Sequence, residues 1–178
     1  MSFSKELLTL KERVLDELAP SFRRIEQMSE ENTLKVLTAM RECKVSDIHF
    51  NTSSGYAYDD IGRSKLEELY AKVFAAESAL VRTQFVSGTH ALATVLFGIL
   101  RPGDKIVSLT GAPYDTMQTV IGYTASSSGS LKEYGILYDE LPLNEGRVDV
   151  ERIADVLDER TKMVLIQRSR GYSRRPTL

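Results

Sequence analysis

The chain has 178 residues, 42% of them hydrophobic, which is enough for one domain with a core of ordinary size. Its formal net charge of -2 at pH 7 excludes the basic surface expected of a nucleic-acid-binding protein. The single cysteine, Cys43, excludes an internal disulfide, and neither His49 nor His90 has neighbours at metal-ligand spacing. Because no apolar stretch is long enough to span a bilayer and no signal peptide is visible, we expect a cytoplasmic chain that binds neither membrane nor nucleic acid.

The first fifty residues are predicted to form a helical arm. Apolar residues recur at helical intervals over residues 3–28, and charged residues occupy the other face. Pro20 should kink or break this helix, and a second helix is expected from Ser29 to about Cys43. Neither helix can bury its apolar face alone, so the arm should pack on the rest of the fold or on another subunit.

Residues 51–63 are predicted to form a polar, aromatic loop because they are rich in turn formers. Ser64 and Glu67 then have the spacing of a capping box, which should open a helix that continues to Phe74. Residues 79–81 follow as a short apolar run, and we expect a strand there that extends at most to Gln84.

The stretch from Phe85 to Thr94 is the most informative part of the sequence. A turn of small residues, Ser87-Gly88-Thr89, leads into helical spacing over residues 91–100. The first amides of such a helix and its dipole favour an oxyanion, Gly88 permits close approach, and the two hydroxyls can donate. An ordinary helix cap has the same composition, so the turn alone leaves both interpretations open.

Strands and helices alternate through the rest of the chain. We expect strands at 105–109, 136–141 and 161–166, helices from Asp115 or Thr116 to 121 and over 148–157, and a Ser/Gly loop at 126–130. This order predicts an α/β fold, a mostly parallel sheet with helices on both faces. Ligands bind beyond the carboxyl ends of such strands, which would bring residues 87–90, residues 111–114 and the loop after Ile166 to one rim.

Three motifs follow one another in this chain: Ser87-Gly-Thr-His-Ala91, Arg101-Pro-Gly-Asp104 and Gly111-Ala-Pro-Tyr-Asp-Thr116. Together they resemble the front half of a pyridoxal-phosphate enzyme of the aspartate-aminotransferase fold. Within that fold, the chain resembles the Cys/Met-metabolism group and, more narrowly, the methionine gamma-lyase-like or aluminium resistance proteins. Residues 55–63 and 168–176 support the narrower resemblance. The resemblance implies a helical arm (1–50), an interface and phosphate loop (51–63) and the first part of the cofactor-binding large domain (64–178).

The resemblance also implies a site for pyridoxal 5'-phosphate. Ser87, Gly88, Thr89 and the His90 amide would hold the cofactor phosphate, while the His90 imidazole can simply pack nearby. Tyr114 would stack on the pyridine ring and exclude water from it. Without the resemblance, Tyr114 would be interpreted as a loop aromatic packed on the surface.

Two further groups of residues acquire roles only through the resemblance. Tyr56, Tyr58 and Arg63 would reach the phosphate of a neighbouring subunit in a homodimer or homotetramer. Arg168 and Arg170, in the basic cluster near the C-terminus, would hold the carboxylate of a small amino-acid substrate. The alternative for both groups is a solvated polar segment.

The family's chemistry needs a lysine that forms a Schiff base and an acid paired with the pyridine nitrogen. Lys162 would lie at the wrong end of the sheet and no lysine follows it, so both residues are expected beyond Leu178. We therefore expect the 178 residues to be an N-terminal portion, inactive alone, with Tyr114 facing residues 87–90 across a gap and no lysine within reach.

The implied function is a carbon–sulfur lyase that acts on a sulfur amino acid by β- or γ-elimination, similar to methionine gamma-lyase or a cystathionine lyase. One alternative is another enzyme of the same fold, an aminotransferase or an aldolase. The other is a non-catalytic α/β module that binds a phosphate-bearing ligand at the same helix.

Overall fold

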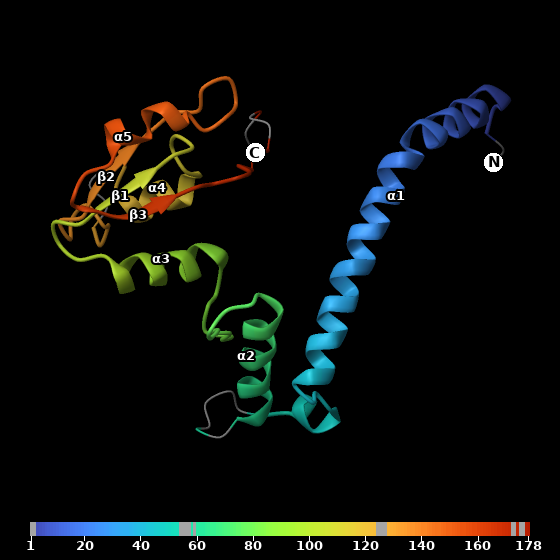
Figure 1. The fold of residues 1–178 in the computed structure, drawn as a ribbon, viewed down its shortest axis with the longest axis horizontal. Coiled ribbons are helices and arrows are strands. Elements are labelled where there is room, and N and C mark those ends of the chain that lie inside the picture. Colours follow the sequence, from blue (N-terminus) through green and yellow to red (C-terminus); the bar gives the residue numbers. More distant parts are fainter. Residues whose placement is uncertain (1–2, 54–57, 59, 124–127, 172–173, 175–176) are drawn as a thin grey trace. The chain divides into compact units, whose positions relative to one another are not determined.

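A computed structural model describes residues 3–53, 58, 60–123, 128–171, 174 and 177–178. The chain forms two compact units, Met1–Thr83 and Gln84–Leu178. Figure 1 shows the first as helical and the second as a small sheet with helices. Within the described residues, no helix combines the length and the apolarity needed to cross a membrane.

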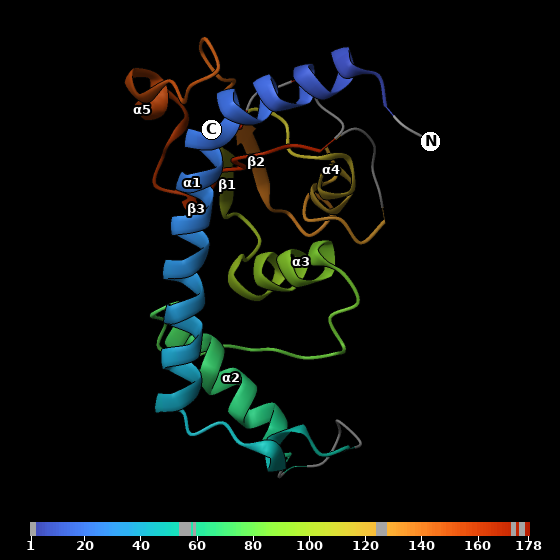
Figure 2. The same cartoon turned by 90° about the vertical axis from the view of Figure 1, so that its right-hand side faces the viewer.

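Helix α1 (Lys5–Glu42) dominates the first unit. Its cap is Ser4, whose hydroxyl oxygen accepts from the Leu7 amide at 3.3 Å. The predicted second helix start at Ser29 is wrong, because α1 continues through Pro20. A proline removes one hydrogen bond from a helix and bends it, and in Figures 1 and 2 the dark-blue end of α1 lies at an angle to the rest.

Helix α2 (Ile61–Val73) follows a short 3-10 helix, η1 (Asp47–Phe50). The predicted start at Ser64 is wrong, because Asp60 caps the helix one turn earlier. One Asp60 oxygen accepts from the Arg63 amide at 2.9 Å and the other from the Ser53 hydroxyl at 2.6 Å. These bonds hold the pKa of the Asp60 carboxyl below its usual value, with the Ser53 bond the largest cause.

Glu67 does not form the predicted capping box with Ser64. Its carboxylate accepts from the Val81 amide at 3.0 Å and pairs with Arg82. The predicted strand at 79–81 is wrong, because this segment is irregular and the Val81 amide bonds to a side chain instead of a neighbouring strand. The two contacts fasten the segment after α2 to α2 itself.

The second unit contains a parallel sheet of three strands in the order β2-β1-β3. The strands are β1 (Lys105–Ser108), β2 (Leu137–Glu140) and β3 (Thr161–Leu165). Its helices are α3 (Gly88–Ile99), α4 (Asp115–Ile121), a 3-10 turn η2 (Val150–Arg152) and α5 (Ile153–Val156). The three strands predicted after residue 100 and the α/β class are confirmed, while the helix expected over 148–157 is shorter. Residues 126–127 of the expected Ser/Gly loop lie outside the described residues.

Helices cover both faces of the sheet, as predicted. Adjacent residues of a strand point to opposite faces, so Ile106 and Val107 of β1 enter different apolar clusters. Ile106 packs with residues of α3 and α4, and Val107 packs near Ile153 and Val156 of α5. Both strand residues are fully buried, which fits a central parallel strand covered on both faces.

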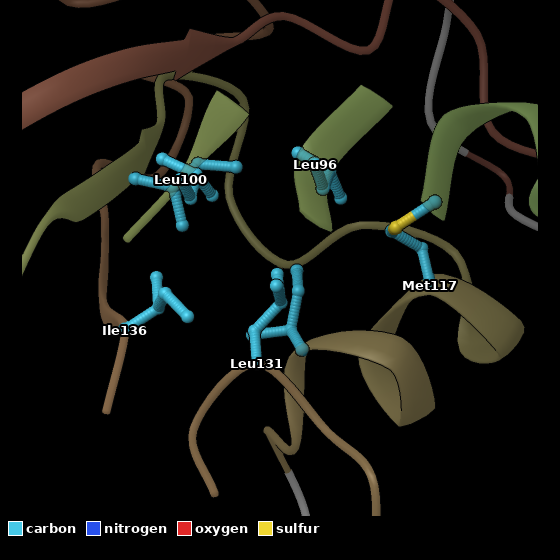
Figure 3. Close-up of a cluster of buried hydrophobic side chains, with 7 residues drawn as sticks. Leu96, Leu100, Met117, Leu131 and Ile136 are labelled. Carbon is cyan, nitrogen blue, oxygen red and sulfur yellow. The ribbon is translucent and has the colours of Figure 1, made fainter. Parts of the chain in front are cut away.

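The larger cluster fixes α3 and α4 against the sheet. Figure 3 shows Leu96, Leu100 at the end of α3, Met117 of α4, Leu131 and Ile136 gathered around one apolar centre. Each is no more than 5% exposed. Because α3 runs back toward the start of β1, this packing leaves the first turn of α3 at the edge where the strands end.

Candidate functional site

The first turn of α3 carries the predicted phosphate-binding residues. Ser87 is extended and its hydroxyl oxygen accepts from the His90 amide at 3.1 Å, so the helix begins at Gly88, earlier than the predicted 91. The His90 amide, expected to hold a phosphate, is therefore bonded within the cap. The amides of Gly88 and Thr89 have no acceptor inside the helix, as for any first turn.

The space in front of Gly88 is open. A methyl group placed on Gly88 would meet no described atom within 4 Å other than those of its two chain neighbours and of the nearby backbone of its own helix. Backbone without a side chain lets an oxyanion approach the first amides closely. The turn thus combines free approach with amide and hydroxyl donors.

Three hydroxyls meet beside this turn. The Thr89 hydroxyl oxygen lies 3.0 Å from the Tyr114 hydroxyl and 3.1 Å from the Thr116 hydroxyl. Because Tyr114 follows β1, these contacts put the start of α3 at the carboxyl edge of the sheet. The expected gap between residues 87–90 and Tyr114 is wrong, because the side chains are in hydrogen-bond contact. The Thr116 contact was not predicted, and its closeness to Tyr114 in the chain is the one signal that points to it.

Tyr114 is held in place from the neighbouring strand. Its amide donates to the Gln167 side-chain oxygen at 3.1 Å, and the Gln167 amide donates to the Thr110 hydroxyl at 3.1 Å. The Tyr114 ring packs against the larger apolar cluster. Gln167, which was not predicted, therefore joins the segment after β3 to the loop after β1 and fixes the Tyr114 backbone.

A carboxylate also lies at the carboxyl edge. Glu140, the last residue of β2, accepts from the Tyr138 hydroxyl at 2.7 Å and the Tyr123 hydroxyl at 3.2 Å. Burial, together with Glu140, raises the pKa of Tyr138 far above its usual value, so this hydroxyl stays protonated. No sequence motif marks this group.

The lysines of this unit lie toward the other edge. Lys105 is the first residue of β1, and its ammonium group contacts the Val156 carbonyl at 2.7 Å, Asp139 at 3.3 Å and Asp158 at 3.4 Å. Lys162 is the second residue of β3 and is exposed. Lys132 lies in the turn before β2. The expectation that Lys162 lies at the wrong end of the sheet agrees with its place in β3.

Residues 7–178 match the family model described as methionine gamma-lyase. The chain belongs to the methionine gamma-lyase family. The protein YnbB of Bacillus subtilis (strain 168), described as uncharacterized, is 46% identical over 163 residues, which are 90% of this chain and 39% of that relative.

Solved structures of similar proteins have the same fold. A "putative cystathionine beta-lyase involved in aluminum resistance" from Listeria innocua has a TM-score of 0.93 at 46% identity, covering 98% of this chain and 43% of that chain. A carbon-sulfur lyase involved in aluminum resistance from Clostridium novyi NT has a TM-score of 0.88 at 48% identity, covering 93% and 41%. The chain therefore spans about two fifths of these relatives, and it matches the fold and the family that the resemblance implied.

Enzymes of the methionine gamma-lyase and cystathionine lyase families generally depend on pyridoxal phosphate, so the residues of this site can be compared with what that cofactor needs. A phosphate needs several donors around an open position, and the first turn of α3 offers the amides of Gly88 and Thr89 and the hydroxyls of Ser87 and Thr89. The half-buried Tyr114 ring lies next to it. These residues fit the phosphate and the adjoining ring of the cofactor.

His90 makes local contacts with its side chain. Its Nδ1 atom accepts from the Val86 amide at 3.4 Å, and its ring meets the Phe85 ring edge-on at a centroid distance of 5.6 Å. The imidazole thus packs on the segment before α3, as the sequence analysis allowed.

The arginines expected near the substrate differ in position. The Arg170 guanidinium donates to the Ala112 carbonyl at 3.2 Å, beside the loop that carries Tyr114. The exposed Arg168 donates to the Leu178 carbonyl at 3.4 Å. Of the two, Arg170 is the one that the contacts bring to the carboxyl edge.

The loop predicted to serve a neighbouring subunit belongs to the first unit. Tyr56 lies outside the described residues. Tyr58 is fully exposed, and Arg63 is half-buried in the first turn of α2, where Asp60 accepts from its amide. Within the described residues, no cluster of histidine, cysteine, aspartate or glutamate could hold a metal ion.

Proposed function

We propose that the protein carrying this chain is a pyridoxal-phosphate-dependent carbon–sulfur lyase that acts on a sulfur-containing amino acid by β- or γ-elimination. The observation that carries the proposal is the open first turn of α3 beside the hydroxyl of Tyr114. Family membership and the lyase names of the similar solved structures support the reaction class. A single cysteine suits a reducing compartment, so we place the protein in the cytoplasm.

Five residues at the carboxyl edge, Ser87, Gly88, Thr89, Tyr114 and Arg170, have a part in this proposal. The amides of Gly88 and Thr89 and the hydroxyls of Ser87 and Thr89 would bind the phosphate, and the Tyr114 ring would shield the cofactor ring from water. When bound, pyridoxal phosphate supplies the electron sink that elimination needs. Arg170, beside the Tyr114 loop, is a donor for the substrate carboxylate.

The covalent and proton-transfer groups are proposed to lie outside this chain. The lysines of the second unit stand toward the amino ends of the strands, and Lys105 already has three partners there. The chain spans about two fifths of its relatives. We assign the Schiff-base lysine and the acid facing the pyridine nitrogen to the length of the protein that these residues do not cover.

Assembly into a homodimer or homotetramer is also part of the proposal. Twelve large apolar side chains of α1, from Leu7 to Leu37, are exposed, and a fully exposed Tyr58 follows in the same unit. An amphipathic helix of this length gains stability by packing on another surface. In the assembly, Tyr56, Tyr58 and Arg63 would contact the phosphate bound to a second copy.

Product analysis tests the reaction. The purified full-length protein, offered L-cystathionine, L-methionine or L-cysteine, should release ammonia and a 2-oxo acid from at least one of them. An aminotransferase would transfer the amino group to an added 2-oxo acid without releasing ammonia, and a binding module would change none of the three.

A second measurement locates the covalent group. Borohydride should fix the cofactor to one lysine outside residues 1–178, identified by mass spectrometry. A stoichiometric adduct on Lys105, Lys132 or Lys162 would contradict the assignment of the carboxyl edge as the site.

A further inference from the structure

The hydroxyl cluster of Thr89, Tyr114 and Thr116 has more protons than internal contacts. Each hydroxyl carries one proton, and the cluster contains two contacts, Thr89 to Tyr114 at 3.0 Å and Thr89 to Thr116 at 3.1 Å. At least one proton is therefore left for an acceptor outside the cluster. Thr89 makes both contacts, so its orientation decides where that proton points.

Other helical threonines of this unit use their protons differently. The Thr94 hydroxyl donates to the His90 carbonyl at 2.9 Å, and the Thr119 hydroxyl donates to the Asp115 carbonyl at 3.4 Å. These are the local side-chain bonds common in helices. Thr89, in the first turn, instead meets two hydroxyls, which can both donate to it.

We propose that Thr116 is a positioning residue of the anion site: by donating to Thr89 together with Tyr114, it directs the Thr89 proton toward an anion in front of Gly88. The inference rests on the proposed function, because it assumes a phosphate at the first turn of α3. The Thr89 oxygen has two lone pairs, and donation from Tyr114 and Thr116 fills both. Its own proton then has no acceptor within the cluster.

The anion strengthens this arrangement. A negative charge attracts the Thr89 proton, and a hydroxyl that donates to an anion becomes a better acceptor for its other partners. The position in front of Gly88 is open, so the anion can reach the amides of Gly88 and Thr89 at the same time. The chemistry favours a phosphate monoester, whose several oxygens can use all these donors.

Substitution of Thr116 tests the inference, with Thr119 as the matched control. Thr116→Val keeps the shape of the side chain but removes the donor, and Thr116→Ser keeps the donor. Thr119→Val makes the same change in the same helix, at a hydroxyl that contacts only a helical carbonyl among the described residues.

The measurement is the dissociation constant of pyridoxal 5'-phosphate for the full-length protein after removal of its cofactor, with pyridoxal as a ligand that lacks the phosphate. Thr116→Val should bind pyridoxal 5'-phosphate about fivefold more weakly than the wild type, as expected for one hydrogen bond. Thr116→Ser and Thr119→Val should bind it like the wild type. The affinity for pyridoxal should be the same in all four proteins.

The outcomes separate the two proposals. A wild-type protein that does not bind pyridoxal 5'-phosphate overturns the proposed function. Binding by the wild type with no loss in Thr116→Val, with an equal loss in Thr116→Ser, or with an equal loss for pyridoxal, overturns the role of Thr116 alone. If Thr116→Val does not fold, Thr116→Ala at this exposed position is titrated with the same outcomes.

Discussion

The two edges of the parallel sheet have opposite chemistry. At the amino edge, Lys105 lies between Asp139 and Asp158, and Arg160 contacts Asp158 at 2.9 Å, so positive and negative groups meet within the protein. At the carboxyl edge, the first turn of α3 offers donors to an open position. The charged groups at the amino edge contact one another and stabilise the fold, whereas the donors at the carboxyl edge can bind a ligand. This contrast gives a physical reason for ligands to bind where the strands end.

The largest expected effect is on stability at the amino edge. Lys105→Met removes an ammonium group that is 11% exposed and leaves two carboxylates and the Val156 carbonyl without it. We expect a loss of about 2 kcal/mol in the free energy of unfolding, less than for a wholly buried pair because the aspartates are partly exposed. The change in the free energy of unfolding is measured from the urea-induced unfolding transition of the second unit.

Lys162→Met is the control for this change. Lys162 stands on the neighbouring strand β3 with its side chain exposed, so its replacement should change the free energy of unfolding by less than about 0.5 kcal/mol. Equal losses in the two variants would mean that the charges at the amino edge are not what stabilises the sheet.

The next effect concerns binding at the carboxyl edge. Gly88→Val adds a side chain where it meets no described atom within 4 Å, so the fold should tolerate it, but the side chain would occupy the place of the anion. We expect the affinity for pyridoxal 5'-phosphate to fall about tenfold. Titration of the cofactor-free protein by absorbance measures it.

Gly98→Val provides the comparison within α3. Gly98 also has no described neighbour within 4 Å of an added methyl group, but it lies near the other end of the helix. Its replacement should leave the cofactor affinity unchanged. A folded Gly88→Val protein with wild-type affinity would contradict the proposal that the phosphate binds at the first turn of α3.

The sheet could be predicted from the sequence because its strands are short apolar runs between turn formers. The runs at 105–109, 136–141 and 161–166 became β1, β2 and β3, with each end at most one residue inside the predicted one. Their alternation with helices was enough to infer parallel pairing. The first turn of α3 could be predicted for a similar reason, since cap and glycine are local signals.

The errors arose where local signals compete. Asp60 and Ser64 are both good caps, and Asp60 prevails because Ser53 and the Arg63 amide both bond to it. The apolar run at 79–81 has the composition of a strand but lies in an irregular segment fastened to Glu67. Composition alone does not reveal whether a partner strand is present.

The hydroxyl cluster could not be predicted from spacing. Thr89 is 25 residues from Tyr114 and 27 from Thr116, and the contact exists only because α3 and α4 pack on the same face of the sheet. Glu140 meets Tyr123 and Tyr138 for the same kind of reason. Sequence motifs point to the candidate binding residues, while packing decides which neighbours contact them.

The smallest expected effect is a pH dependence that belongs to the amino edge. The Arg160 side chain is the main reason that the pKa of Asp158 falls to about 2, with Lys105 a smaller contribution, while an unfolded aspartate has a value of 3.8. A lowered folded-state pKa adds stability above about pH 4 and loses it as the pH falls toward 2, because the unfolded chain takes up the proton first. Asp158→Asn should therefore have a lower melting temperature than the wild type at pH 6, and the difference should shrink as the pH falls from 4 to 2. The threonine side chain has no group that ionises, so Thr116→Val should keep a constant difference from the wild type over the same pH range. A difference for Asp158→Asn that stays the same from pH 6 to pH 2 would contradict the pairing of Asp158 with Arg160 and Lys105.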